Sequence, residues 1–186
     1  MLECLEKDVT PSVGLLTFHT TVVKLLWNWN GEDPEKLFWS RIHYHEKRLK
    51  QCKQTFPKSH DFGGYGQIQI KALVECYLNL GIVYYNKGIN SEALQSYKRA
   101  LSTATKSFGE EHESTADSYS QLGVTQNKMH DNSAALQSHQ RALAIRIKLF
   151  GEDHESTADS YRELGVTQNK MHDNSAALQS LSLIHI

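Results

Sequence analysis

A sixteen-residue segment occurs twice, letter for letter, in this chain. The sequence "GVTQNKMHDNSAALQS" occupies residues 123–138 and again residues 165–180. An enzyme needs one copy of its catalytic groups, whereas a scaffold of stacked units needs the same packing surface in each unit. The duplication therefore favours a repeat protein over an enzyme with a single active site.

A third, more divergent copy lies upstream and defines the period. The three copies align on a glycine that recurs every 42 residues, at Gly81, Gly123 and Gly165. A constant period means that each unit meets the next in the same geometry. The first copy reads Tyr77-x-x-Leu80-Gly81-x-x-Tyr84 and continues with Ala93, Tyr97 and Ala100.

The spacing in each copy predicts two packed helices. Tyr77, Leu80 and Tyr84 fall on one helical face, and Gly81 lets a second helix approach closely. The first helix is expected to break at Gly88, where "KGINSEAL" follows. For the second helix we expect N-caps at Asn90 or Ser91 in the first copy and at Asn132 and Asn174 in the later copies.

This aromatic-x-x-Leu-Gly-x-x-Tyr pattern resembles the tetratricopeptide repeat. The resemblance implies an all-α fold, a right-handed α-solenoid of antiparallel helix pairs. The consensus repeat has about 34 residues, so the longer period here leaves room for a longer second helix and loop. The motif "FGE-x-HE", at Phe108-Gly109 and Phe150-Gly151, is similar to the kinesin light chain and nephrocystin-like repeats. Where those families commonly have proline, this chain has Glu113 and Glu155, which favour a helix start through the helix dipole.

The pattern divides the chain into three parts. Residues 71–180 are expected to form the repeat array, with hairpins near 74–107, 116–150 and 158–180. Residues 1–70 are expected to be helical, and one interpretation is a degenerate repeat with a core helix over 13–27 and a second helix after Asp33 and Pro34. The glycine-rich segment 60–66 is expected to be a loop. The final "LSLIHI", residues 181–186, resembles a translated cloning or adapter scar.

The small and apolar residues on the packing faces of the predicted helices are expected to be buried. They are Leu80, Gly81, Ala93, Leu122, Gly123, Ala135, Leu164 and Gly165.

Charge and cysteine content exclude several classes of partner. The formal net charge of −1 provides no basic surface for nucleic acid or acidic lipid, so neither partner is expected. The chain has 3 cysteines and no C-x-x-C pair, so reduced thiols and a cytoplasmic location are expected. The apolar segment over 13–27 is too short to span a bilayer.

The residues that invite a chemical function have simpler explanations. His112, His130, His154 and His172 recur with the period, as any residue of a duplicated unit does, and no metal-ligand spacing accompanies them. Cys76 has no defined base partner and suits a packing position. Glu113 and Asp117 lie one turn apart and suit a helix start better than acid and base catalysis. No enzyme activity, cofactor, metal or small-molecule substrate is expected.

The first helices of successive units are expected to line a concave groove that binds a peptide. Asparagine can bond the main chain of an extended peptide, and lysine would favour an acidic one. Two of the three differences between the two late copies, at positions 120/162 and 121/163, fall near this groove. The other interpretation, a merely solvated helix face, fits the sequence equally well. The candidate groove residues are Asn79, Ile82, Tyr85, Asn86, Gln121, Val124, Asn127, Lys128, Arg162, Glu163, Val166, Asn169 and Lys170.

The leading functional interpretation is a non-catalytic scaffold that binds a peptide or a partner helix. One alternative is a cargo adaptor of a microtubule motor, although no heptad run that could pair with a motor chain is visible. Another is the ligand-sensing array of a larger signalling NTPase whose catalytic domain lies upstream, since the chain itself contains no Walker motif.

Overall fold

The structure is all-helical. The computed structural model describes residues 33–55 and 63–184, and this part of the chain contains six helices and no strand. The helices are α2 (Pro34–Thr55), α3 (Gly63–Lys87), α4 (Asn90–Phe108), α5 (Glu113–Lys128), α6 (Asn132–Phe150) and α7 (Glu155–Ile184). The all-α prediction is confirmed. The predicted helix over 13–27 lies outside the described residues.

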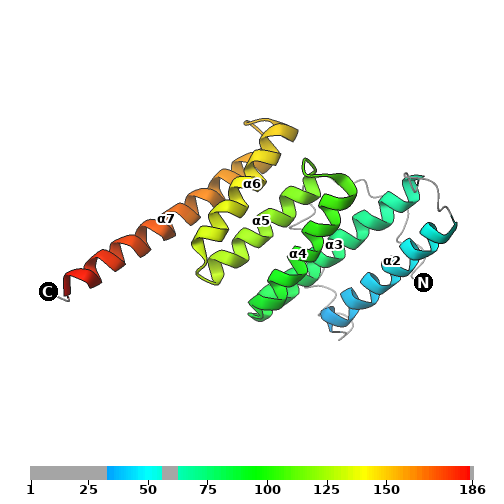
Figure 1. The fold of residues 1–186 in the computed structure, drawn as a ribbon, viewed down its shortest axis with the longest axis horizontal. Coiled ribbons are helices and arrows are strands. Elements are labelled where there is room, and N and C mark those ends of the chain that lie inside the picture. Colours follow the sequence, from blue (N-terminus) through cyan, green and yellow to red (C-terminus); the bar gives the residue numbers. More distant parts are fainter. Residues whose placement is uncertain (1–32, 56–62, 185–186) are drawn as a thin grey trace.

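The helices stack in sequence order along the long axis of the molecule (Figure 1). The closest pairs are the hairpins α3–α4 and α5–α6, and the helix that precedes each first helix packs on it, α2 on α3, α4 on α5 and α6 on α7. Neighbouring first helices also touch, α3 with α5 and α5 with α7. This nearest-neighbour pattern is that of an α-solenoid.

Helix α2 begins where the sequence predicts. The Oδ1 of Asp33 accepts the backbone N–H of Glu35 at 3.1 Å, and Pro34 is the first helical residue. Phe38 and Ile42, 4% and 2% exposed, belong to the same apolar cluster as the α3 side chains. Pairing with α3 therefore gives α2 a buried face.

Helix α3 begins earlier than predicted. Gly63, Gly64 and Gly66 were expected in a loop, but they form its first turns. Glycine costs about 1 kcal/mol in a helix, and packing can offset that cost. Gly66 and Gln69 are buried, and the Oε1 of Gln69 lies 2.7 Å from the Nδ1 of His45 on α2.

Each hairpin is held by a glycine on the first helix against a ring on the second. A Cβ added at Gly81 would lie 2.4 Å from the Tyr97 ring, and one added at Gly123 would lie 2.6 Å from the His139 ring. Both rings are almost fully buried, at 1% exposed. Only glycine allows this approach.

The predicted interior residues are buried in the first two units. Leu80, Ala93 and Ala135 are 0% exposed, Leu122 is 4% exposed, and Gly81 and Gly123 are buried. The prediction is wrong for the third unit, where Leu164 and Gly165 are only half-buried. A Cβ at Gly165 would meet no atom within 4 Å, because no second helix of the described chain covers this face.

The predicted third hairpin, near 158–180, is one continuous helix instead. In the second unit the chain turns through Met129 and His130, whose φ of 63° is left-handed. The identical sequence around His172 stays helical within the 30-residue α7. A left-handed non-glycine residue costs about 1–2 kcal/mol. In the second unit the packing of α6 offsets this cost, whereas after Ser180 the sequence departs from that of α6.

The second helices begin one residue earlier than the predicted caps. The N-cap of α4 is Ile89, without a side-chain bond, in place of Asn90 or Ser91. The N-cap of α6 is Asp131, which accepts the N–H of Ala134 at 3.2 Å, in place of Asn132. Asn132 is buried instead. Asn174 lies inside α7, so no cap is needed there.

The recurring "FGE-x-HE" motif builds a compact loop and helix start. Gly109 adopts a left-handed φ of 94°, and the imidazole of His112 stacks on Phe108 with centroids 4.4 Å apart. The Nδ1 of His112 accepts the N–H of Ser114 at 3.1 Å, and Thr115 donates to the Gly109 carbonyl at 2.9 Å. The same four features recur one period later. The histidines of this motif are therefore N-caps.

We expect His112 to make stability depend on pH. Burial lowers its pKa below the ordinary value, with nearby charges giving smaller effects, and its capping Nδ1 must be unprotonated. The cap therefore contributes fully above about pH 6.5 and is lost as pH falls through the lowered pKa. Asparagine caps a helix without titrating in this range. In His112→Asn the free energy of unfolding, measured with urea, should therefore fall less between about pH 7 and pH 5 than it does in the wild type. Equal pH profiles for both proteins would contradict this role.

We expect Gly123→Leu to destabilise the chain by about 1–3 kcal/mol, because the side chain must enter the space of the buried His139 ring. Urea unfolding followed by helical circular dichroism measures the change. Gly165→Leu is the matched control: it makes the same change in the same local sequence, but the new side chain meets open space. Equal losses in the two variants would show that the hairpin contact does not set stability.

Candidate functional site

The predicted groove residues lie on α3, α5 and α7, the three neighbouring first helices. Their exposure varies along the row. The exposed members are Asn86, Lys128, Arg162, Val166, Asn169 and Lys170. The half-buried members are Asn79, Ile82, Tyr85, Gln121, Val124 and Glu163, and Asn127 is buried.

Lys128 joins the first two units. Its Nζ lies 3.9 Å from the ring centroid of Tyr85 and donates to the Tyr85 carbonyl at 2.8 Å. A cation over an aromatic face contributes about 0.5–1 kcal/mol at an exposed site. Lys128 is therefore exposed but already ordered, and it presents its charge at a fixed place between α3 and α5.

Asn127 does not face solvent. It is 8% exposed, and its Nδ2 donates to the Thr167 hydroxyl at 2.7 Å and lies 3.5 Å from the Nε2 of His139. This amide belongs to the packing between the second and third units. Of the three asparagines predicted to line the groove on successive first helices, Asn86 and Asn169 are exposed and Asn127 is not.

Lys170 and Arg162 bring further positive charge to α7. The guanidinium of Arg162 bonds the exposed carboxylate of Asp159 at 2.7 Å, so its charge is partly neutralised. Among the residues whose side chains the structure describes, Lys170 forms no ion pair. Lys128 and Lys170 are therefore the cations on this row that form no ion pair with a carboxylate whose side chain the structure describes.

A polar cluster that the sequence analysis missed lies at the contact between the second and third units, which we call the second joint. Glu163 accepts the Ser120 hydroxyl at 2.6 Å, and its Oε2 lies 3.3 Å from the Nδ1 of the buried His139. Burial would raise the pKa of Glu163, but the bonds from His139 and Ser120 outweigh it and lower the pKa. The differences at 120/162 and 121/163, interpreted above as groove tuning, therefore include residues of this joint.

Arg146 forms the second half of the joint. Its guanidinium donates to Asp117 on α5 at 2.9 Å and to Ser160 on α7 at 2.6 Å, so one side chain connects three helices. Burial raises the pKa of Asp117 even though the positive charge of Arg146 opposes it. Asp117 is therefore a structural partner of Arg146.

The first joint, the contact between the first and second units, is built differently. Leu78, Tyr97 and Ala104 are buried there, and one period later the chain has Ser120, His139 and Arg146. Aligning the copies of the repeat would have revealed this change from apolar to polar residues. It could not have revealed the partners, because Glu163 and Ser160 come from the next unit.

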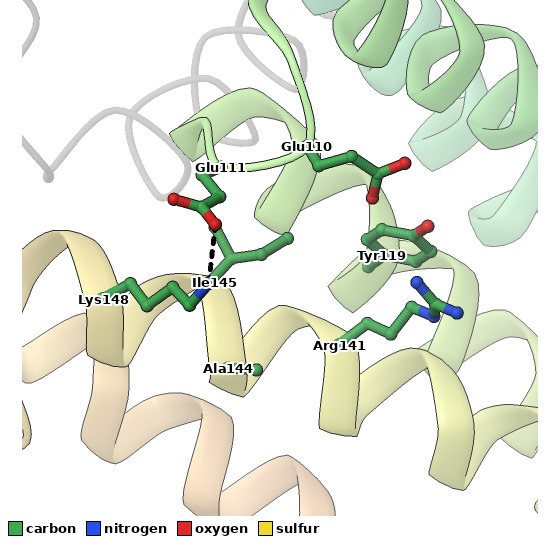
Figure 2. Close-up of a pocket in the computed structure, with 7 residues that line it drawn as sticks. All are labelled: Glu110, Glu111, Tyr119, Arg141, Ala144, Ile145 and Lys148. Carbon is green, nitrogen blue, oxygen red and sulfur yellow. Dashed lines mark hydrogen bonds and ion pairs between the residues drawn. The ribbon is translucent and has the colours of Figure 1, made fainter.

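A small surface pocket of about 240 Å³ lies beside α5, α6 and the loop before α5 (Figure 2). Figure 2 shows Glu110 and Arg141 on either side of the Tyr119 ring. Lys148 bonds Glu111 at 2.6 Å. Tyr119 lies on the other side of α5 from Gln121 and Val124, so this pocket is separate from the row of groove residues. Its lining residues are Glu110, Glu111, Tyr119, Arg141, Ala144, Ile145 and Lys148.

The residues considered for catalysis or metal binding have structural surroundings. Cys76 is buried, and burial raises the pKa of its thiol to about 11, so it is held as the neutral thiol. Over the described ranges, no group of three or more His, Cys, Asp or Glu side chains is arranged to hold a metal ion. No helix in that part of the chain has the length and apolar character to cross a membrane.

Comparison with known proteins identifies the repeat. The family model of the tetratricopeptide repeat matches residues 73–148 and, overlapping, 127–182. The chain belongs to the tetratricopeptide repeat family. No curated protein sequence matches this tetratricopeptide repeat chain.

A solved structure has the same fold. The crystal structure of BtubC (BKLC) from P. vanneervenii matches this tetratricopeptide repeat array with a TM-score of 0.51 and 17% identity, covering 73% of this chain and 67% of that one. The match shows that the two chains share a fold.

We expect Arg146→Ala to destabilise the joint between the second and third repeats. The change leaves the Asp117 carboxylate without its cation, at a cost of about 1–3 kcal/mol, below that of a fully buried pair because Asp117 is 26% exposed. Urea unfolding measures it. Adding Asp117→Ala should recover part of the loss, since no unpaired carboxylate then remains. A double variant less stable than the single one would contradict this ion pair.

Proposed function

We propose that this chain is a non-catalytic scaffold that binds an extended peptide or a partner helix on the surface formed by α3, α5 and α7. Tetratricopeptide repeats generally mediate protein–protein interaction. The observation that carries the proposal is the row of exposed polar side chains on consecutive first helices, with Asn86, Lys128, Asn169 and Lys170 as its members. The proposal includes no catalytic step, cofactor or small-molecule substrate.

The charges of this row favour an acidic ligand. Lys128 is ordered by its contact with Tyr85, and Lys170 is exposed one period away. Two cations on successive units attract a ligand with carboxylates at a matching spacing. Asn86 and Asn169 can both donate to and accept from a peptide main chain, which holds the ligand independently of its side chains.

Two narrower functions remain as alternatives. A motor cargo adaptor is suggested by the similarity of the "FGE-x-HE" motif to kinesin light chain repeats, and a sensor of a signalling NTPase would use the same surface. Each would add a further domain to the same binding surface. The test below therefore addresses what all three functions share.

The test measures binding of labelled extended peptides of one length and of acidic, neutral or basic composition. We expect the acidic peptide to bind most tightly, and its affinity to fall as the salt concentration rises. The double change Lys128→Glu with Lys170→Glu should lower this affinity at least about tenfold. It should also make the affinity depend less on salt, because the charges act within a screening length of about 10 Å at 0.1 M salt.

Two controls separate charge from folding. Lys98→Glu makes a like charge change at an exposed position on the second helix α4 and should leave binding unaltered. Lys170→Glu alone retains the Lys128–Tyr85 contact and should show part of the loss. Acidic-peptide affinity that ignores the double reversal, or that falls equally with Lys98→Glu, would overturn the proposed surface.

A further inference from the structure

The carboxylates at helix α2 all bond side chains of α3. Asp33, just before α2, and Glu35 lie 3.4 and 3.0 Å from the Nζ of Lys87. The carboxylate of Glu46 accepts the hydroxyl of Tyr77 at 2.9 Å. The negative charges of this helix are therefore turned towards α3, and they leave its outward side to other residues.

A row of basic and neutral polar side chains runs along that outward side, opposite the buried Phe38 and Ile42. Its members follow one another at intervals of three or four residues, so they share one helical face over about 21 Å. All of them are exposed, and its lysines form no ion pair within the part of the chain that the structure describes. We call this row the α2 face, and it consists of Lys36, Ser40, His43, Lys47 and Lys50.

An aromatic ring with a guanidinium over it borders the α2 face on each side. On one side Tyr44 is 49% exposed, and the Cζ of Arg48 lies 5.8 Å from its ring centroid. On the other side Trp39 is 41% exposed, and the Cζ of Arg99 on α4 lies 5.8 Å from its ring centroid. Each ring therefore combines exposed apolar surface with a positive charge beside it.

We propose that the α2 face binds single-stranded nucleic acid. The lysines contact the phosphates, and unpaired bases stack on the Tyr44 and Trp39 rings, a combination that holds a single strand without reading its sequence. RNA and DNA share phosphates and bases, so the face takes either. The net charge of −1 does not oppose this binding, because it is a sum over the whole chain, whereas the strand meets one basic face.

Other anionic partners match this face less closely. A membrane surface is bound tightly by helices whose apolar side chains enter the lipid, and the α2 face has none. An acidic peptide would pair with the lysines, but its carboxylates have no flat surface to lie on the two rings. In a duplex the bases are already stacked on one another. The exposed rings therefore favour a single strand.

The first measurement is the binding of labelled oligothymidylate and oligouridylate of one length to the full chain, by fluorescence anisotropy between about 50 and 200 mM salt. We expect both strands to bind. The logarithm of the association constant should fall with the logarithm of the salt concentration, with a slope of about −0.7 for each phosphate contact.

A double lysine variant tests the phosphate contacts. Lys47→Gln with Lys50→Gln removes two of them, so the affinity should fall and the salt slope should become shallower by about 1.4. Lys128→Gln with Lys170→Gln makes the same change of charge on α5 and α7, and it is the control that should alter neither quantity.

Tyr44→Ala tests the stacking. It removes a stacking surface but no charge, so the affinity should fall at least about fivefold while the salt slope stays the same. Tyr44→Phe keeps the ring and should bind like the wild type. Circular dichroism of each variant checks that helix content is retained.

Four results would overturn the proposal. They are no binding of either strand at about 50 mM salt, an affinity that ignores the Lys47 and Lys50 changes, an affinity that ignores Tyr44→Ala, and equal affinity for the strand, its duplex and an acidic peptide of the same charge. None of them bears on the proposed peptide-binding surface, which uses residues of α3, α5 and α7.

Discussion

The contact between a bare glycine and a buried ring holds each repeat together. Gly81 lies against Tyr97 and Gly123 against His139, and no Cβ fits in either place. Where the ring is missing, at Gly165, the first helix remains half-exposed and the hairpin is absent. In the two complete repeats this contact sets how closely the helices pair, and the first helices α3, α5 and α7 lie next to one another to form the proposed binding surface.

The two joints between repeats use different physical means for the same geometry. The first buries Leu78, Tyr97 and Ala104 in one apolar cluster. The second relies on hydrogen bonds and an ion pair, with Arg146 connecting three helices. Bonded polar groups gain little net free energy but are costly to leave unpaired. The second joint is therefore the more sensitive to a single substitution, while the first is the more tolerant of changes in pH.

The sequence was a good guide to the repeat and a partial guide to the site. The period predicted which helices pair, and the loops after Phe108 and Phe150 have the helix start that their motif predicts. The groove prediction placed Lys128 and Lys170 on exposed surface but put Asn127 there too, although it is buried. Helical spacing assigns a residue to a face, and it does not tell whether the next unit covers that face. Asn127 is covered by Thr167, 40 positions away.

The sequence by itself determined the helical class, the period, the glycine contacts of the first two units and the family of this protein, because these depend on local spacing repeated along the chain. The tertiary structure decided the backbone of the duplicated segment. Residues 123–138 turn through a left-handed His130, whereas the same letters at 165–180 run straight. The free energy of the turn is small and unfavourable, so it forms only where a complete second helix packs against the first and offsets it.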